Sequence, residues 1–472
     1  MELLRREVAV GKWHARDFVR SRAGHLGVLP LCLLYWLHPS SRRRATAIMA
    51  AHRYSMFASS DRLGAWVSKR MAAGKDAILA AAPGITSVPA PDAFDEVAAR
   101  SIVLKAPVLA GTGEKGVLLI TFTDSFNYYH HHIDTARLAR YFRVVLEPSW
   151  AGYATPEILA WASVPSSVIV QASEQRDESF LARLGTNLVP IRMGASDWVD
   201  YRTFHPLPGV EKEFDALLIA NYNPVKRHHL YFRALRHIAD PSFRAALVMA
   251  RWGGPREPLQ ALIEHYKLRD RLTVFEQVSQ SELNAILNRS KVNLMLSRKE
   301  GSNRALFEGF FADVPGILIA DNVGVNRGHI TPQTGRVCGA DKLAEALLHF
   351  RDHWRDYSPR AWAMAHIAPE VTAKRLGALL RGLALAAGEQ WTTDLVPKVN
   401  SPEVSYLSDE TRAGLPAARE VLALFRKERR LTDAVLETEL CRLCAGASRP
   451  ARPPAGRKRK GKPGFRAGRP GA

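Results

Sequence analysis

Residues 298–309 read Arg298-Lys299-Glu300-Gly301-Ser302-Asn303-Arg304-Ala305-Leu306-Phe307-Glu308-Gly309, with two acids eight positions apart. The preceding residues 292–296, Val-Asn-Leu-Met-Leu, have the pattern of a buried strand, and residues 304–311 have that of a helix. Backbone N–H groups at a helix start have no partner within the helix and attract anions. Two carboxylates beside such a start indicate a site for a phosphorylated ligand rich in hydroxyl groups.

Working outward, buried strands alternate with helices on both sides of this stretch, which predicts parallel sheets. Upstream we expect four strands and three helices, the strands at 117–122, 143–146, 167–170 and 188–193 and the helices at 135–141, 156–162 and 173–184. Residues 194–213 have no periodic pattern and are interpreted as a linker.

After the linker the alternation restarts as five βα units, the size of one doubly wound domain. The expected strands lie at 215–220, 245–250, 272–275, 292–296 and 316–320, and the helices at 228–238, 258–266, 281–288, 304–311 and 341–354. Two such domains in tandem place a ligand cleft at the carboxyl ends of their strands.

The charge of the chain is concentrated at its two ends. The 472 residues carry a formal net charge of +20, with 14 Lys or Arg against 4 Asp or Glu in residues 1–75, and 9 Lys or Arg without any acid in residues 445–472. The body between is nearly neutral, so the excess charge acts through the ends. The four cysteines do not suggest a disulfide framework, which fits a reducing cytoplasm.

An apolar run, Leu26 to Leu37, is too short to span a bilayer as a helix. Its length favours a core or docking helix. The alternative is an interfacial segment, because Trp36 and the basic residues Arg42-Arg43-Arg44 would suit the headgroup layer of an anionic membrane. The chain is therefore expected to be cytoplasmic, with the inner membrane surface as a second location.

Two further motifs lie at predicted strand ends of the second domain. Asn221-Tyr222-Asn223-Pro224-Val225-Lys226-Arg227-His228 follows its first strand, where Lys226 and Arg227 could neutralise a diphosphate or simply begin a solvated helix. Gly253-Gly254 follows the second strand and permits either close approach to a ligand or a plain turn.

Taken in order, the motifs of residues 194–355 resemble the C-terminal domain of family-4 retaining glycosyltransferases (glycosyl transferases group 1), which have the GT-B architecture. Gly194–Asp197 with Phe204-His205-Pro206 is similar to the linker motif of that family. Lys226 falls on its phosphate-binding lysine, Gly253-Gly254-Pro255 resembles its glycine turn, and Glu300 with Glu308 resembles its E-x7-E pair.

The resemblance implies roles for these residues. Glu300 would act in catalysis by contacting the donor sugar, and Glu308 would bind the ribose hydroxyls. Donor binding would also involve cationic, amide and glycine positions, namely Asn221, Lys226, Arg227, Gly253, Gly301, Ser302, Asn303 and Arg304. Asn221 stands where the family has an arginine, and Arg304 could supply that missing cation.

The first domain gives weaker signals. Residues 123–132, Thr-Asp-Ser-Phe-Asn-Tyr-Tyr-His-His-His, are expected to form a polar loop facing the cleft, with Asp124 and His131 as catalytic candidates and Glu174 as a further one. A metal site is the rival interpretation. Adjacent histidines cannot easily all face one ion, so no metal and no cofactor is expected.

The predicted fold class is therefore α/β of the GT-B type, two Rossmann-like doubly wound domains facing a cleft. The expected divisions are a helical basic extension (1–100), an acceptor domain (101–205), a nucleotide-sugar domain (206–370), C-terminal helices (371–444) and a disordered basic tail (445–472).

The predicted function is transfer of a sugar from a nucleotide-sugar to a glycan or lipid-linked acceptor, with retention of anomeric configuration and with an anionic membrane surface as a further partner. Two alternatives stay open at this point: a nucleotide-sugar epimerase or hydrolase of the same fold, and a non-catalytic nucleotide- or membrane-binding protein. Nucleic acid is not expected as a partner.

Overall fold

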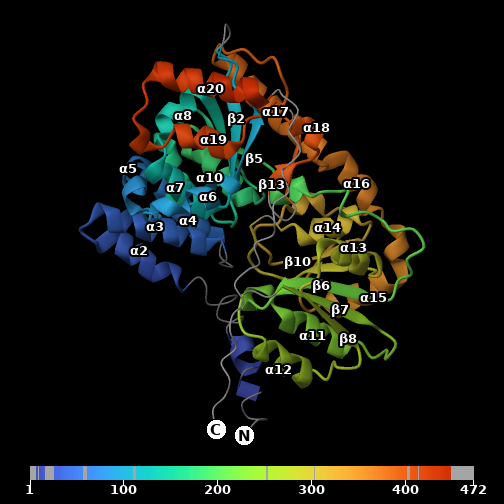
Figure 1. Ribbon diagram of the computed structural model, residues 1–472. Coiled ribbons are helices and arrows are strands. Elements are labelled where there is room, and N and C mark those ends of the chain that lie inside the picture. The colour runs from blue at the N-terminus through green and yellow to red at the C-terminus, as the bar shows by residue number, and fades with distance from the viewer. Residues whose placement is uncertain are drawn as a thin grey trace, which may run out of the picture.

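The structure is a computed structural model that describes residues 7–8, 10–15, 26–56, 61–109, 113–250, 253–301, 303–400, 404–412 and 414–447. These residues form two α/β lobes, each built on one sheet and joined by chain segments that cross between them (Figure 1). The predicted tail lies outside the described residues from position 448 onward.

The first lobe contains a five-stranded sheet in the order β1-β2-β3-β4-β5. Its strands are β1 (Ser101–Lys105), β2 (Gly116–Thr121), β3 (Phe142–Glu147), β4 (Val168–Gln171) and β5 (Leu188–Ile191). Strand β1, which the sequence pattern did not predict, runs antiparallel to β2, and the other neighbours are parallel. The strands β1 to β4 are buried along their whole length, as expected for strands covered on both faces.

The second lobe contains a six-stranded parallel sheet in the order β11-β10-β9-β6-β7-β8. Its strands are β6 (Ala216–Asn221), β7 (Ala245–Ala250), β8 (Leu272–Glu276), β9 (Asn293–Met295), β10 (Gly316–Ile319) and β11 (Gly335–Cys338). The order reverses between β6 and β9, so this sheet is doubly wound. In the first sheet the strands follow in chain order, and that reversal is absent.

Helices cover both sheets. In the first lobe they are α2 (Val28–Leu37), α3 (Ser41–Ser55), α4 (Asp61–Ala73), α5 (Lys75–Ile85), α6 (Phe94–Ala99), α7 (Thr123–His132), α8 (Thr135–Tyr141), α9 (Pro156–Leu159) and α10 (Gln175–Leu184). In the second lobe they are α11 (His228–His237), α12 (Glu257–His265), α13 (Gln280–Asn288), α14 (Ala305–Phe311), α15 (Leu343–His353) and α16 (Pro359–His366). The remaining helices are α17 (Pro369–Ala386), α18 (Asp409–Arg412), α19 (Ala418–Leu424) and α20 (Asp433–Ala447), and a hairpin joins β12 (Lys398–Asn400) to β13 (Val404–Tyr406).

Both ends of the chain cross between the lobes. Val10 and Trp13 pack into the core of the second lobe, although helices α2 to α6 that follow belong to the first lobe (Figure 1). The C-terminal helices return to the first lobe, where α17 covers one face of the sheet and α19 and α20 share the core on the other. Helices α2 to α6 of the predicted extension and the C-terminal helices α17, α19 and α20 are thus integral parts of the first lobe.

Two of the crossing segments are tied together at Asp197. This carboxylate has no solvent exposure; it accepts hydrogen bonds from the backbone N–H of Gly194 (3.0 Å) and from Arg375 Nη2 on α17 (2.7 Å), and His329 Nε2 lies 3.4 Å away. Although burial by itself raises the pKa of Asp197, His329 and Arg375 together hold it below its usual value. The linker and the returning helix therefore share one buried charge.

Within the described ranges, no helix combines the length and the apolar character needed to cross a membrane.

The shared charge predicts a stability effect with a defined pH dependence. Asp197→Asn should lower the free energy of unfolding at pH 7 by about 2 kcal/mol, because hydrogen bonds to a charged group are lost. Since the folded-state pKa is depressed, this difference from wild type is fully present above the ordinary aspartate pKa and disappears as pH falls through the folded pKa. Urea unfolding at a series of pH values measures it.

Asp352→Asn is the matched control, because Asp352 is an exposed aspartate paired with an arginine. It should leave the unfolding free energy nearly unchanged. Equal effects of the two substitutions would contradict the role given to Asp197.

Candidate active site

The strand-order reversal of the second sheet brings two loops together. Strands β6 and β9 are neighbours at the reversal, and the loops after their carboxyl ends carry Lys226 and Glu300. Lys226 Nζ lies 2.5 Å from Glu300 Oε1, although the two residues are 74 positions apart. The hydroxyl of Ser297 donates to the same carboxylate oxygen. A sheet of this kind binds ligands at such a crevice.

The backbone of Glu300 is held from both lobes. Its N–H donates to Val323 O (2.8 Å) in the second lobe, and its carbonyl accepts from the N–H of Ala151 (3.1 Å) in the first lobe. The loop after β9 is therefore fixed at the boundary between the lobes, and the Glu300 carboxylate with it.

Gly301 continues this contact. The hydroxyl of Ser173, just after β4, donates to Gly301 O (3.0 Å) and to Gly324 O (2.7 Å). A Cβ atom at Gly301 would lie 1.8 Å from Ser149 O, so only glycine allows the two backbones to approach so closely. The sequence predicted Gly301 as a phosphate-binding amide, and the structure shows it as a contact between the lobes.

Glu308 is buried in the first turns of α14. It is 7% exposed, and no hydrogen bond to its carboxylate occurs among the residues that the structure describes. Burial raises the pKa of Glu308, and the nearby Arg304 opposes the rise. A buried carboxylate without a donor is costly, which makes this position suited to a ligand that brings hydroxyl groups.

The two other predicted cations already have protein partners. Arg227 is 5% exposed and its Nη1 lies 2.7 Å from Asp321 Oδ1, in the loop after β10. Arg304 donates through Nη1 to the carbonyl of Asn400. Of the three predicted cations, Lys226 is thus the one in contact with Glu300.

A side chain of the turn before α14 already bonds to one backbone N–H group at the start of this helix. Asn303 Oδ1 accepts from the N–H of Leu306 (3.0 Å), which satisfies one of the unpaired amides of a helix only seven residues long. Ser302 lies outside the described residues.

Asn221 and Gly253 shape the loops at the neighbouring strand ends. Asn221 Oδ1 accepts from the N–H of Asn223 (3.0 Å), and a Cβ atom on Gly253 would lie 2.9 Å from the same nitrogen. The φ angle of Gly253 is 98°, which strongly favours glycine. Both residues therefore bring the loops after β6 and β7 together.

The structure corrects the expected loop of the first lobe. Residues 123–132 form helix α7, and the predicted loop is wrong. His131 lies at the far end of this helix, about 12 Å by helical rise from Thr123, and its Nε2 pairs with the hydroxyl of Thr86 (2.7 Å). The predicted cleft position of His131 is therefore wrong as well. The polar buried residues Ser125 and Asn127 hid the helix, because they break the apolar period.

Asp124 lies exposed in the first turn of α7. The neighbouring Thr123 hydroxyl accepts from the N–H of Ser149 (3.1 Å), in the loop that touches Gly301. Asp124 is thus at the cleft end of α7, and its catalytic role stays a prediction.

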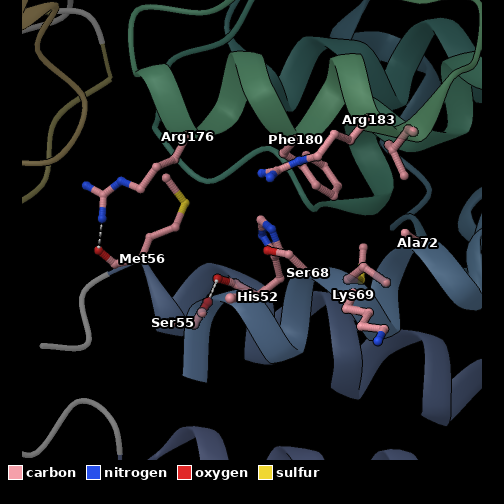
Figure 2. Close-up of a pocket in the computed structure, with 13 residues that line it drawn as sticks. His52, Ser55, Met56, Ser68, Lys69, Ala72, Arg176, Phe180 and Arg183 are labelled. Atoms are coloured by element: carbon pink, nitrogen blue, oxygen red, sulfur yellow. Dashed lines mark hydrogen bonds between the residues drawn. The ribbon is translucent and has the colours of Figure 1, made fainter. Parts of the chain in front are cut away.

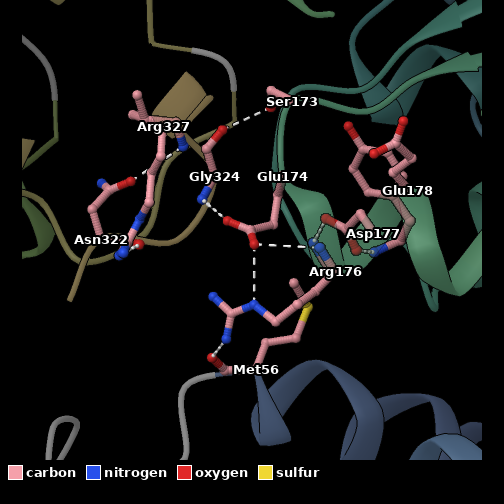
Figure 3. Close-up of polar contacts among 12 residues, drawn as sticks. Met56, Ser173, Glu174, Arg176, Asp177, Glu178, Asn322, Gly324 and Arg327 are labelled. Carbon is pink, nitrogen blue, oxygen red and sulfur yellow. Dashed lines mark hydrogen bonds and ion pairs between the residues drawn. The ribbon is translucent and has the colours of Figure 1, made fainter. Parts of the chain in front are cut away.

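Three residues of the first lobe hold the boundary, and the sequence singled out one of them. Glu174 Oε2 accepts from the N–H of Gly324 (3.1 Å), and its Oε1 pairs with Arg176 Nε (3.0 Å) (Figure 3). Ser173 and the fully buried Asp177 were missed. The Asp177 oxygens accept from the N–H groups of Gly152 (2.7 Å) and Tyr153 (2.8 Å), and burial raises its pKa to about 7. Ser173 could have been found from its position just after a strand, whereas Asp177 lies in the first turn of α10.

A cavity of about 560 Å³ opens beside this boundary. It lies between the loop after β10 and the start of α10, and its charged lining residues are Glu174, Arg176, Arg192, Arg298, Asp321 and Arg327. Four arginines against two acids give it a positive balance, which suits an anionic ligand.

With this geometry in view, the comparison with protein families decides the assignment. Residues 202–350 match the family model described as Glycosyl transferases group 1. The second lobe is a group 1 glycosyltransferase domain. The matched range contains Lys226, Glu300 and Glu308, and the predicted fold class of two α/β lobes of the GT-B type is confirmed. No curated protein matches the chain.

Several solved structures resemble this chain distantly. Sucrose-phosphate synthase from Thermosynechococcus elongatus is 18% identical, with 64% of this chain and 82% of that chain covered and a TM-score of 0.46. Anabaena HepE in complex with UDP and glucose is 14% identical (56% and 78% covered, TM-score 0.44). TarM of S. aureus is 12% identical (55% and 54% covered, TM-score 0.43). Likenesses of this size carry no inference about substrate.

The contact at Gly301 predicts a measurable change at the boundary. Gly301→Ala should force the two backbones apart, because the new Cβ meets the carbonyl oxygen of Ser149. The amide of Ala151 then loses its acceptor and should exchange its hydrogen faster, by hydrogen–deuterium exchange with mass spectrometry.

Gly382→Ala on α17 is the control, because a Cβ there has no neighbour within 4 Å. It should leave exchange at Ala151 unchanged. Unaltered exchange in both variants would show that the close approach at Gly301 does not hold the boundary.

Proposed function

We propose that the protein transfers a sugar from a nucleotide-sugar to a glycan or lipid-linked acceptor, with retention of configuration at the anomeric carbon. The observation that carries the proposal is the joint position of Lys226 and Glu300 at the strand-order reversal, with the unpaired Glu308 on the adjoining helix. In such a donor complex the cation binds the diphosphate and the first carboxylate binds the sugar. The second, buried carboxylate binds the ribose.

Charge develops on the leaving group during this reaction. The bond between the anomeric carbon and the phosphate oxygen breaks, and its electron pair stays on the phosphate. Lys226 stabilises that negative charge, and its partly buried position strengthens the interaction. Glu300, which pairs with Lys226 in the free protein, exchanges that partner for hydroxyl groups of the donor sugar.

The acceptor hydroxyl then bonds to the anomeric carbon from the face that the phosphate leaves. Its proton passes to the departing phosphate, so no separate base and no metal is required. Glu308 accepts hydrogen bonds from the ribose hydroxyls, which relieves the cost of a buried carboxylate without donors. Binding of the nucleoside half thus depends on Glu308.

An acceptor presented at an anionic membrane surface fits the outer face of α2. Leu29, Leu33 and Leu37 lie one helical turn apart in sequence and are 52%, 60% and 77% exposed, whereas Val28 and Cys32 on the other face are buried. Trp36 is 54% exposed, with Arg70 4.9 Å above its ring. So large an apolar face is unusual for a soluble surface.

The charges beside α2 also favour contact of this helix with an anionic membrane. Residues 26–60 contain no acid, and Arg42, Arg43 and Arg44 are exposed at the start of α3, directly after α2. An apolar helix face bordered by arginines is typical of a helix lying in the headgroup layer of an anionic bilayer.

The donor site is tested at Lys226 and Glu300. Lys226→Ala and Glu300→Gln should each reduce kcat/KM for sugar transfer from the active nucleotide-sugar by roughly 100-fold or more, since each removes charge aimed at the reacting groups. Release of nucleoside diphosphate from a panel of UDP-, GDP- and ADP-sugars gives the rate, and proton NMR of the product gives its anomeric configuration.

Lys342→Ala serves as the control, since Lys342 is an exposed lysine of the same lobe. Full activity of Lys226→Ala, or an inverted product, would be incompatible with the proposal. Nucleotide-sugar turnover without any acceptor would instead indicate an epimerase or hydrolase.

The membrane surface is tested by charge on α2. Leu33→Glu with Leu37→Glu should abolish co-flotation with vesicles of phosphatidylglycerol and phosphatidylcholine, because a carboxylate cannot enter the headgroup–acyl boundary cheaply. Wild type should float with these vesicles and much less with pure phosphatidylcholine.

Leu385→Glu, at a leucine of α17 that is 56% exposed, controls for the loss of any exposed apolar side chain. Flotation of the α2 double variant equal to wild type would remove α2 as the attachment surface.

A further inference from the structure

A second cavity, of about 460 Å³, lies in the first lobe between helices α3 and α4 on one side and α10 on the other (Figure 2). It belongs to the first lobe alone, away from Lys226 and Glu300. Met56 and Arg176 line both this cavity and the one at the lobe boundary, so the two are adjacent.

Among the residues that the structure describes, the charged lining of this cavity is basic. Arg176 and Arg183 come from α10 and Lys69 from α4. Arg183 uses Nε to donate to Ser179 O (3.1 Å). Arg176 is held by Met56 O (2.5 Å) and by Glu174. The guanidinium of Arg183 therefore has fewer bonds to the described residues than that of Arg176.

His52 is the polar group most deeply placed in this cavity. It rises from α3 between Ser68 and Phe180 (Figure 2) and is 4% exposed, with its ring centroid 4.4 Å from that of Phe180. Its Nδ1 is buried and has no hydrogen-bond partner within the described part of the chain. Because almost none of the surface of this nitrogen is accessible, a ligand in the cavity acts on the imidazole through its charge and not through a bond to Nδ1.

The protonation of His52 adds to this picture. Burial, helped by the charge of Arg183, lowers the pKa of His52 to about 4, so the imidazole is neutral at pH 7. Of the three basic lining residues, Arg183 is the one whose charge acts on His52, whereas Lys69 points away from the ring and Arg176 turns toward Met56 (Figure 2). An anion placed among them would stabilise the imidazolium form.

The other walls are apolar. Met56, Met71, Phe180 and Leu184 line the cavity together with three small residues. A free phosphate or a sugar phosphate would leave these walls without contact, whereas an amphiphile would cover them while its anionic group meets Arg183 and His52. Helix α2, with its exposed residues Leu29, Leu33 and Leu37, packs beside α3.

We propose that this cavity binds the phosphate group of an amphiphilic phosphate ester, the lipid-linked acceptor of the transfer reaction. Arg183 pairs with the phosphate oxygens, the imidazole of His52 lies beside the bound phosphate, and the apolar walls hold the first part of the lipid chain. The inference rests on the proposed function for its biological meaning, but the binding it describes can be measured without the reaction.

The test uses the full chain with octyl phosphate and glucose 1-phosphate as probes. Calorimetry should detect octyl phosphate, and Arg183→Ala should weaken its affinity at least tenfold. Arg62→Ala, an arginine of α4 that does not line the cavity, should bind octyl phosphate like wild type.

An NMR titration of the His52 ring, assigned by its absence in His52→Gln, gives a second readout. Saturating octyl phosphate should raise the pKa of His52 by one unit or more, and glucose 1-phosphate should not. Equal responses to both probes would overturn the amphiphile, and no response to either would overturn the site. Because Arg183→Ala keeps the donor site intact, this variant should bind UDP like wild type. Failure of wild type to bind UDP would overturn the donor site and leave octyl phosphate binding in place, whereas failure of wild type to bind octyl phosphate would overturn the cavity proposal alone.

Discussion

The two lobes and the candidate site depend together on the backbone of Glu300 and Gly301. Its carbonyl groups accept from Ala151 and Ser173 of the first lobe, and the N–H of Glu300 donates to Val323 of the second. The absence of a side chain at Gly301 allows this approach. A carboxylate aimed from such a peptide has its position fixed by both lobes, which is the kind of preorganisation that electrostatic stabilisation requires.

The charges around this peptide are distributed unequally. Lys226 contacts Glu300, whereas Arg227 is bound to Asp321 and Arg304 to the carbonyl of Asn400. The latter two arginines fasten loops: one joins the loops after β6 and β10, and the other joins the start of α14 to the returning C-terminal segment. Rigid loops at the strand ends support the site even where their cations do not touch it.

The sequence predicted best the strands that carry long apolar runs. Strands β2 to β4 and β6 to β10 have continuous apolar patterns, and the structure has them within one or two residues of the expected bounds. It missed β1, whose buried Lys105 pairs with Glu114, and β11, whose middle residues are exposed. It also missed α7, because buried polar side chains there hide the helical period. In β1 and α7 the apolar pattern is interrupted by buried polar side chains, and in β11 it is interrupted by exposed residues, so the pattern alone does not show these elements.

The sequence by itself determined the alternation of strands and helices, the motif positions of Lys226, Glu300 and Glu308, and the concentration of charge at the ends. Tertiary structure alone decided which of these residues meet. It placed His131 away from the cleft, gave Arg227 and Arg304 other partners, and made Gly301 a contact between lobes. It also left Leu29, Leu33 and Leu37 of α2 exposed, and His52 Nδ1 without a hydrogen-bond partner among the residues that the structure describes. Local patterns follow from the period of the backbone, whereas these pairings depend on strand order and on chain crossings that join residues from 45 to 128 positions apart.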